Sequence, residues 1–155
     1  MALEIERKYL VKRLPPLESG TRIVQGYLSF DPTVRVRLKG GHGRLTIKSR
    51  ASTDGISRLE YEYEIPASDA EELFRLCKGA LIEKTRYVIG RVELDVFDGD
   101  NAGLILAEIE LSSEDERVEL PTWLGREVTG LKRYYNSELV LRPYKDWTKA
   151  ERFDE

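Results

Sequence analysis

The stretch Glu4-Ile5-Glu6-Arg7-Lys8, close to the start of the chain, carries charged side chains at alternate positions 4, 6 and 8. Alternate residues of a β-strand point to the same face of a sheet. A strand here would therefore present Glu4, Glu6 and Lys8 on one face. The same alternation of charge recurs in strand after strand, and a closed sheet lined in this way would form a site for metal ions and a polyanion.

Eight segments of the sequence are predicted to form β-strands. They span residues 2–11, 21–30, 33–39, 43–50, 56–65, 82–90, 91–98 and 103–111. Turn-forming residues such as Asp31-Pro32 and Asp54-Gly55 separate most of these segments, and short connections favour antiparallel pairing. The predicted fold class is mainly β (α+β), with eight strands in a closed antiparallel tunnel barrel and a few flanking helices.

Two longer segments are predicted to be helical. Ser68-Asp69-Ala70-Glu71 has the pattern of a capping box, and it would open a helix that runs to about residue 78 with Cys77 on its buried face. A second helix is expected from Lys132 to Leu141, where Pro143 would stop it.

Length and composition indicate one domain over residues 1–155, with 142–155 as a candidate mobile tail. Charged residues make up 34% of the chain, yet the net charge is only −3, so there is no overall basic field to hold nucleic acid or an anionic membrane. The sequence has one cysteine, no signal-peptide pattern and no apolar run of the ~20 residues that span a membrane. We expect a cytoplasmic protein.

The charges on the predicted strands are sorted by sign. The charged face of the strand at 33–39 is entirely basic, whereas those at 91–98 and 103–111 are entirely acidic. The full set comprises nine acids and eight bases: Glu4, Glu6, Glu60, Glu62, Glu64, Glu93, Asp95, Glu108 and Glu110, with Lys8, Arg35, Arg37, Lys39, Lys48, Arg58, Lys84 and Arg86. A sheet face exposed to water would explain why charged residues alternate with apolar ones. A structural network of ion pairs would explain the nearly equal numbers of acids and bases. A face that is only solvated usually mixes its signs, however, because like neighbours repel.

A dry barrel interior could not hold so many charges. Desolvation costs several kcal/mol per ion, whereas the stability of a whole domain is only about 5–15 kcal/mol. The lumen is therefore expected to contain water and ions. Glutamate oxygens suit Mg²⁺ or Mn²⁺, and arginine binds phosphate oxygens through two donors. Carboxylates with arginines and lysines are the groups that metal-assisted phosphoryl transfer requires.

The sequence resembles the CYTH superfamily, also called the triphosphate tunnel metalloenzymes. EIERK matches the ExExK motif of that family, and the resemblance continues in order through VRVRLK, TIK, SRLEYEYEIP, EKTRY, ELDVF, LAEIE and KRYYN. It covers nearly the whole chain up to the C-terminal tail. One departure is Thr129-Gly130-Leu131, where the family often has acidic residues before KRY. The resemblance implies a tunnel barrel that hydrolyses triphosphates with Mg²⁺ or Mn²⁺, with two ions expected per site.

The resemblance also implies roles for individual residues. The expected metal ligands are Glu4, Glu6, Glu60, Glu62, Glu108 and Glu110. The residues expected to bind the phosphates of the substrate are Lys8, Arg35, Arg37, Lys48, Arg58, Lys84, Arg86 and Arg133. The expected catalytic residues are Glu62, Arg35, Arg37 and Arg86. Of these, Glu62 would orient the attacking water, and the three arginines would stabilise charge on the equatorial phosphate oxygens.

Several functions could use such a site. Hydrolysis of the terminal phosphate of inorganic tripolyphosphate is the leading hypothesis. The alternatives are class IV adenylate cyclase activity, hydrolysis of thiamine or nucleoside triphosphates, and non-catalytic binding of polyphosphate. No motif identifies a purine pocket, and a binding module would not need the acidic pairs. The apolar outer faces of the strands also suggest a homodimer, and His42 is expected to be a solvated turn residue.

Overall fold

The computed structural model describes residues 3–152. It contains all eight predicted strands: β1 (Leu3–Val11), β2 (Thr21–Phe30), β3 (Thr33–Lys39), β4 (His42–Lys48), β5 (Ser57–Ile65), β6 (Ile82–Ile89), β7 (Val92–Phe97) and β8 (Ile105–Glu110). The predicted start of the first strand at residue 2 lies outside the described residues. A short additional strand, β9 (Leu124–Glu127), pairs with the end of β1. The sequence does not predict β9, because four residues are too few to show an alternation.

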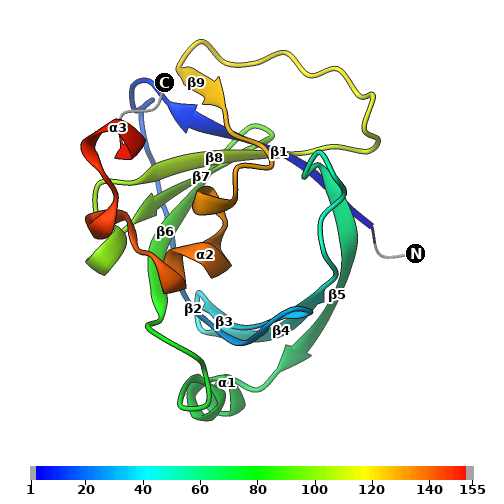
Figure 1. Ribbon diagram of the computed structural model, residues 1–155, viewed down its shortest axis with the longest axis vertical. Helices are drawn as coiled ribbons and strands as arrows, with labels where there is room; N and C mark the ends of the chain where they lie inside the picture. Colours follow the sequence, from blue (N-terminus) through cyan, green and yellow to red (C-terminus); the bar gives the residue numbers. More distant parts are fainter. Residues whose placement is uncertain (1–2, 153–155) are drawn as a thin grey trace.

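The strands close into a barrel. Neighbouring strands pair antiparallel in the order β5-β4-β3-β2-β6-β7-β8-β1. A further antiparallel pairing, which sets Leu3 of β1 opposite Leu59 of β5, closes the ring. Figure 1 looks along this ring. The closed eight-stranded antiparallel barrel that the sequence predicts is therefore confirmed.

Successive residues of each strand alternate between the inside and the outside of the barrel. On β3, Arg35 and Arg37 face an internal cavity, whereas Val36 between them is buried on the outer side. The helix α1 (Ala67–Phe74) packs outside the barrel against β3 and β4 (Figure 1). An apolar cluster covers the outer faces of β1, β7 and β8, with one residue just after β8 and one from β9, and Val118 and Trp123 pack against it. Its buried members are Ile5, Tyr9, Val92, Ala107, Ile109, Leu111 and Leu124.

The capping box predicted at Ser68 is wrong. The helix α1 starts at Ala67, and its N-cap residue is Pro66, which makes no side-chain capping bond. The carbonyl of Pro66 accepts the first helical hydrogen bond from the Ala70 N–H at 3.1 Å, so the Ser68 side chain lies inside the helix instead of at its cap. The helix also ends at Phe74, and half-buried Cys77 lies beyond it, beside Gly26 of β2.

The predicted helix from 132 to 141 is interrupted. A 3₁₀ turn, η2 (Lys132–Tyr134), is followed by Tyr135 in an extended conformation (φ −71°, ψ 136°) and then by α2 (Asn136–Leu141). The carbonyl of Tyr134 accepts a hydrogen bond from Lys8 Nζ at 3.2 Å, and the same ammonium lies 5.3 Å from the centre of the Tyr135 ring. The break therefore turns this segment toward charged side chains inside the barrel, which a continuous helix would not do.

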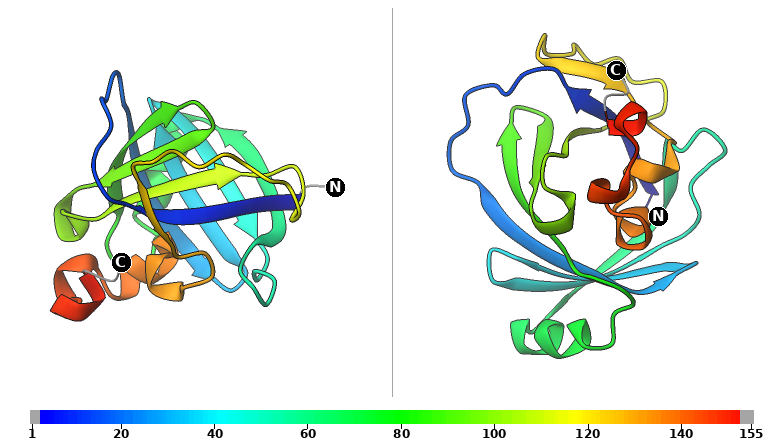
Figure 2. Two further views of the ribbon diagram at one scale, coloured as in Figure 1. Left: turned by 90° about the horizontal axis from the view of Figure 1, so that it is seen from above. Right: turned by 60° about the vertical axis from the view of Figure 1, so that its left-hand side comes forward.

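The C-terminal segment closes one end of the barrel. Tyr134, Leu139 and Trp147 share a buried cluster with barrel residues, namely Tyr27, Ile82, Phe97, Leu104, Leu106 and Val128. In the view along the ring, α2 falls within the outline of the strands (Figure 1), and the side view shows the C-terminal segment at one end of the barrel (Figure 2, left). Two more short elements follow, η3 (Tyr144–Asp146) and α3 (Lys149–Arg152). Within residues 3–152, no helix has the length and apolar character needed to cross a membrane.

Candidate functional site

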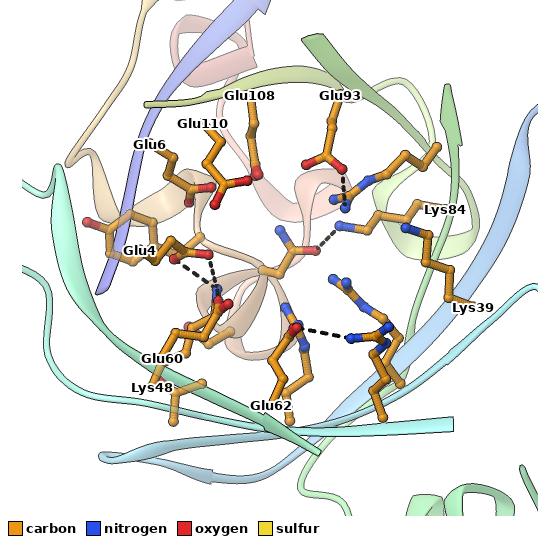
Figure 3. A pocket seen from close by; sticks show the side chains of 18 of the residues that line it. Glu4, Glu6, Lys39, Lys48, Glu60, Glu62, Lys84, Glu93, Glu108 and Glu110 are labelled. Carbon is orange, nitrogen blue, oxygen red and sulfur yellow. Dashed lines mark hydrogen bonds and ion pairs between the residues drawn. The ribbon is translucent and has the colours of Figure 1, made fainter. Parts of the chain in front are cut away.

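The barrel encloses a cavity of about 710 Å³ that is lined mostly by charged residues. The described residues that line it include nine basic side chains, Lys8, Arg35, Arg37, Lys39, Arg44, Lys48, Arg58, Lys84 and Arg86, and eight glutamates, Glu4, Glu6, Glu60, Glu62, Glu64, Glu93, Glu108 and Glu110. Tyr135, Asn136 and Ser137 of the C-terminal segment form its floor. Figure 3 shows Glu4, Glu6, Glu108 and Glu110 gathered on one wall and Lys39 and Lys84 on the other side.

The structure brings nearly all the predicted site residues together. All six predicted metal ligands line the cavity, as do all the predicted phosphate-binding residues except Arg133. The guanidinium of Arg133 instead lies over the rings of Tyr134 and Trp147, 4.8 and 5.6 Å from their centres. Arg133 therefore packs within the aromatic cluster behind the floor.

Several lining residues are not in the predicted set. Arg44 is an inward residue of β4, and the alternation through Thr46 and Lys48 could have identified it. His42 is exposed, as expected, but it is the first residue of β4 and not part of the turn, and it also lines the cavity. Tyr135 and Asn136 belong to the KRYYN motif of the family resemblance, which could have identified them, whereas the expected continuous helix gave no reason to place them inside the barrel.

The acidic wall is built by β1 and β8. Their register sets Glu6 opposite Glu110 and Lys8 opposite Glu108. Burial, together with the charges of Glu108 and Glu4, raises the pKa of Glu6 to about 8. Burial also disfavours ionisation of Glu108, but Lys8, 3.6 Å away, and the neighbouring Arg86 hold the pKa of Glu108 well below its usual range. This wall therefore keeps one carboxyl group ionised and leaves its neighbour protonated at neutral pH.

A second acidic group lies where β1 meets β5. Lys48 Nζ is 3.1 Å from oxygens of both Glu4 and Glu60, and Arg58 Nε is 3.3 Å from Glu4. Burial opposes ionisation of Glu4, yet Lys48 and its other neighbours lower the pKa of Glu4 to about 2. Burial and the contact with Glu4 raise the pKa of Glu60 to about 7.

The basic wall contains arginines that are positioned by neutral partners. Arg37 Nε donates to Gln25 Oε1 at 2.8 Å, and an Arg35 terminal nitrogen donates to Thr46 Oγ1 at 3.2 Å. Arg35 is only 7% exposed, and its buried Nε has no hydrogen-bond acceptor among the described residues. Arg35 Nε is closed off from the cavity as well, so Arg35 can offer an anion only its terminal guanidinium nitrogens.

At the base of the cavity a buried carboxylate fixes two further cations. Asp95 accepts two hydrogen bonds from Arg86, at 2.8 and 2.9 Å, and its second oxygen lies 2.7 Å from Lys84 Nζ. Lys84 also donates to Asn136 Oδ1 at 3.0 Å. Because Asp95 is itself buried, both cations are held in place before any ligand enters.

The carboxylate oxygens of the cavity glutamates are ligands of the kind that hard divalent cations prefer. Within the described part of the chain, no three Asp, Glu, His or Cys side chains already converge on one point. Lysines hold Glu4, Glu60 and Glu108 instead. The donor atoms are nevertheless carboxylate oxygens, and their mutual repulsion, which contributes to the raised pKa of Glu6, is what a divalent cation would relieve.

Comparison with known proteins places the chain among triphosphate-processing enzymes. The model of the CYTH domain family matches residues 2–143. An inorganic triphosphatase of Acetivibrio thermocellus is 46% identical, with 95% of this chain and 99% of the relative covered, and one of Nitrosomonas europaea is 41% identical, with 89% and 97% covered. The crystal structure of the inorganic triphosphatase NE1496 superposes with a TM-score of 0.64 at 38% identity and covers 91% of this chain and 96% of its own.

Proposed function

Because the chain belongs to the CYTH domain family, we propose that it is an inorganic triphosphatase, which removes the terminal phosphate of tripolyphosphate with the help of a divalent metal. One observation carries this proposal. A single cavity contains an acidic wall from β1 and β8 and cations from β3 and β6 that Gln25, Thr46 and Asp95 hold in place. Such a cavity can take a polyanion and its counter-ions together.

The basic residues are proposed to bind and orient the substrate. Arg35, Arg37 and Arg86 would stabilise charge on the equatorial oxygens of the terminal phosphate. Arg58, Lys8, Lys48 and Lys84 would neutralise the rest of the chain of phosphates. Glu62 lies within 3.6 Å of Arg35 and accepts hydrogen bonds from Arg44 and Thr46, which would hold it in position to orient the attacking water.

Triphosphatases of this family depend on metal, and we propose Mg²⁺ or Mn²⁺, with two ions per site. Their ligands would come from the glutamates of the cavity, namely Glu4, Glu6, Glu60, Glu62, Glu108 and Glu110. When bound, such ions supply positive charge next to the phosphate oxygens.

Product analysis tests the proposal and separates it from its rivals. Purified protein is incubated with tripolyphosphate, ATP or thiamine triphosphate, each with Mg²⁺, Mn²⁺ or EDTA. We expect water to cleave tripolyphosphate into one phosphate and one pyrophosphate, with slower turnover of the other two compounds and none in EDTA. Cyclic AMP with pyrophosphate from ATP would indicate a cyclase instead, and tight binding without turnover would indicate a binding module.

Two expectations remain predictions, namely a cytoplasmic location and a homodimer. A second copy would have to cover the exposed apolar residues on the outer face of β5, which are Leu59, Tyr61 and Tyr63. Sedimentation of the wild-type protein and of Tyr61→Ser, each at several concentrations, measures whether a dimer forms through this face.

A further inference from the structure

Lys48 connects two of the proposed metal ligands. Its Nζ lies 3.1 Å from both oxygens of Glu4 and 3.1 Å from Glu60 Oε2. The two carboxylates belong to different strands, β1 and β5, and Figure 3 shows both of them turned toward Lys48. An ammonium ion therefore lies between two carboxylates that are proposed to hold a metal ion.

Strand pairing fixes this arrangement. Lys48 of β4 is directly opposite Glu60 of β5, and Glu4 of β1 is directly opposite Arg58 of β5. The side chains of Lys48 and Glu4 are only 9% and 14% exposed. Since water and salt screen a buried ion pair weakly, Lys48 is a strong competitor for these carboxylates. Its flexible four-carbon side chain allows the ammonium to leave without any movement of the strand.

We propose that Lys48 and a divalent cation compete for Glu4 and Glu60. The cation then binds tightly only when a triphosphate pairs with the Lys48 ammonium and releases the two carboxylates. This inference rests on the proposed function. If a cation binds the two carboxylates in the absence of triphosphate, the buried Lys48 ammonium is left without a counter-ion, which is costly. A phosphate oxygen supplies that counter-ion. Each ligand therefore strengthens binding of the other, and linkage requires the effect to be equal in both directions.

Binding of Mn²⁺ in the absence of triphosphate tests the proposal, with free Mn²⁺ measured by electron paramagnetic resonance. Lys48→Met removes the competitor, and we expect it to bind Mn²⁺ about tenfold more tightly than the wild type, within the range of roughly 5- to 150-fold typical of coupled sites. Lys39→Met is the matched control, because Lys39 lines the same cavity and its loss removes the same charge. The control should tighten Mn²⁺ binding much less than Lys48→Met does.

Equal Mn²⁺ affinities for Lys48→Met and Lys39→Met would overturn the competition while leaving the triphosphatase proposal intact. If neither variant nor the wild type binds Mn²⁺, both the competition and the proposed metal site fail. The wild-type protein gives a second measurement, should Lys48→Met not fold. On titration with Mg²⁺, the NMR signal of the Lys48 ammonium should shift and its protons should exchange faster with water. A Lys48 signal that stays unchanged at saturating Mg²⁺ would overturn the proposal.

Discussion

Asn136 Oδ1 of α2 accepts a hydrogen bond from Lys84 Nζ of β6 at 3.0 Å. The same oxygen accepts a second hydrogen bond from Gln25 Nε2 of β2 at 2.9 Å. Gln25 in turn accepts one from Arg37. A single side chain of the floor therefore ties the C-terminal segment to two strands and helps to fix two cations of the cavity.

Replacement of Asn136 should weaken both the fold and the site. In Asn136→Ala, Lys84 and Gln25 each lose a part-buried acceptor, which should lower the free energy of unfolding by about 1–3 kcal/mol. The KM for tripolyphosphate should rise as well, because Lys84 is no longer held. Urea unfolding followed by tryptophan fluorescence, together with steady-state kinetics, measures both effects. Ser137→Ala at the adjacent floor position is the control, and an Asn136→Ala protein as stable as this control would contradict the assigned role.

Glu6→Gln should separate metal binding from stability. The pKa of Glu6 is raised to about 8, so at pH 7 the wild-type carboxyl group is mostly protonated and resembles the amide of glutamine. We expect the free energy of unfolding at pH 7 in EDTA to stay within about 0.5 kcal/mol of the wild type, as for substitutions that disturb no buried interaction. Binding of Mn²⁺ and metal-dependent turnover should both be lost. A Glu6→Gln protein with wild-type affinity for Mn²⁺ would remove Glu6 from the metal ligands.

Stability in EDTA should fall as the pH rises from about 5 to about 7. The pKa values of Glu6 and Glu60 are raised to about 8 and 7, so the folded protein holds these protons more tightly than the unfolded chain does. The free energy of unfolding then decreases with pH in this window, by at most about 1.4 kcal/mol per pH unit for each group. Above pH 7 the pKa of Lys84, which burial lowers to about 7, acts in the opposite direction, because the folded protein holds that proton less tightly than the unfolded chain does. Below this window the lowered pKa of Glu4 acts in the opposite direction, so stability is lost as the pH falls toward 2.

Urea unfolding at a series of pH values measures this dependence. Glu6→Gln has no proton to release at that position, so its stability should depend less steeply on pH than that of the wild type. If the free energy of unfolding depends on pH equally steeply in the two proteins, the pKa of Glu6 is not raised by folding.

Arg35→Lys should weaken binding of tripolyphosphate more than it affects the fold. Lysine keeps the charge but lacks the planar guanidinium, which can donate two parallel hydrogen bonds to phosphate oxygens. We expect tripolyphosphate to bind at least about tenfold more weakly, because a hydrogen bond to a charged group contributes about 1.5–3 kcal/mol. Calorimetric titration in EDTA measures binding without turnover. Arg44→Lys, an arginine of the same cavity that pairs with Glu62, is the control, and an equal loss in both variants would argue against a special role for Arg35.

The barrel and its charged lining were predictable because they depend on a two-residue period. That period puts Arg35, Arg37 and Lys48 on one face in any antiparallel sheet, and the sorting by sign indicates that this face is enclosed. Even the Lys48 contact with Glu60 follows from simple strand register.

The floor was not predictable for a physical reason. The stretch after Lys132 has the composition of one helix, and only its contacts with the barrel break it at Tyr135. That break turns Asn136 toward the cavity and leaves Arg133 behind the floor, over Tyr134 and Trp147. Likewise Pro66, and not the capping pattern at Ser68, decides where α1 begins.

The central claim is that the charged cavity hydrolyses tripolyphosphate with the help of metal held by its glutamates. The most direct test is the release of phosphate and pyrophosphate from tripolyphosphate by the wild type and by Glu110→Gln, with Mn²⁺ and with EDTA. We predict equal amounts of the two products from the wild type with Mn²⁺ and no products in EDTA. In Glu110→Gln we predict that the rate of turnover with Mn²⁺ falls by at least about a hundredfold, as when one preorganised group that stabilises the transition state is removed. Turnover by the wild type in EDTA, or full activity of Glu110→Gln with Mn²⁺, would contradict the account.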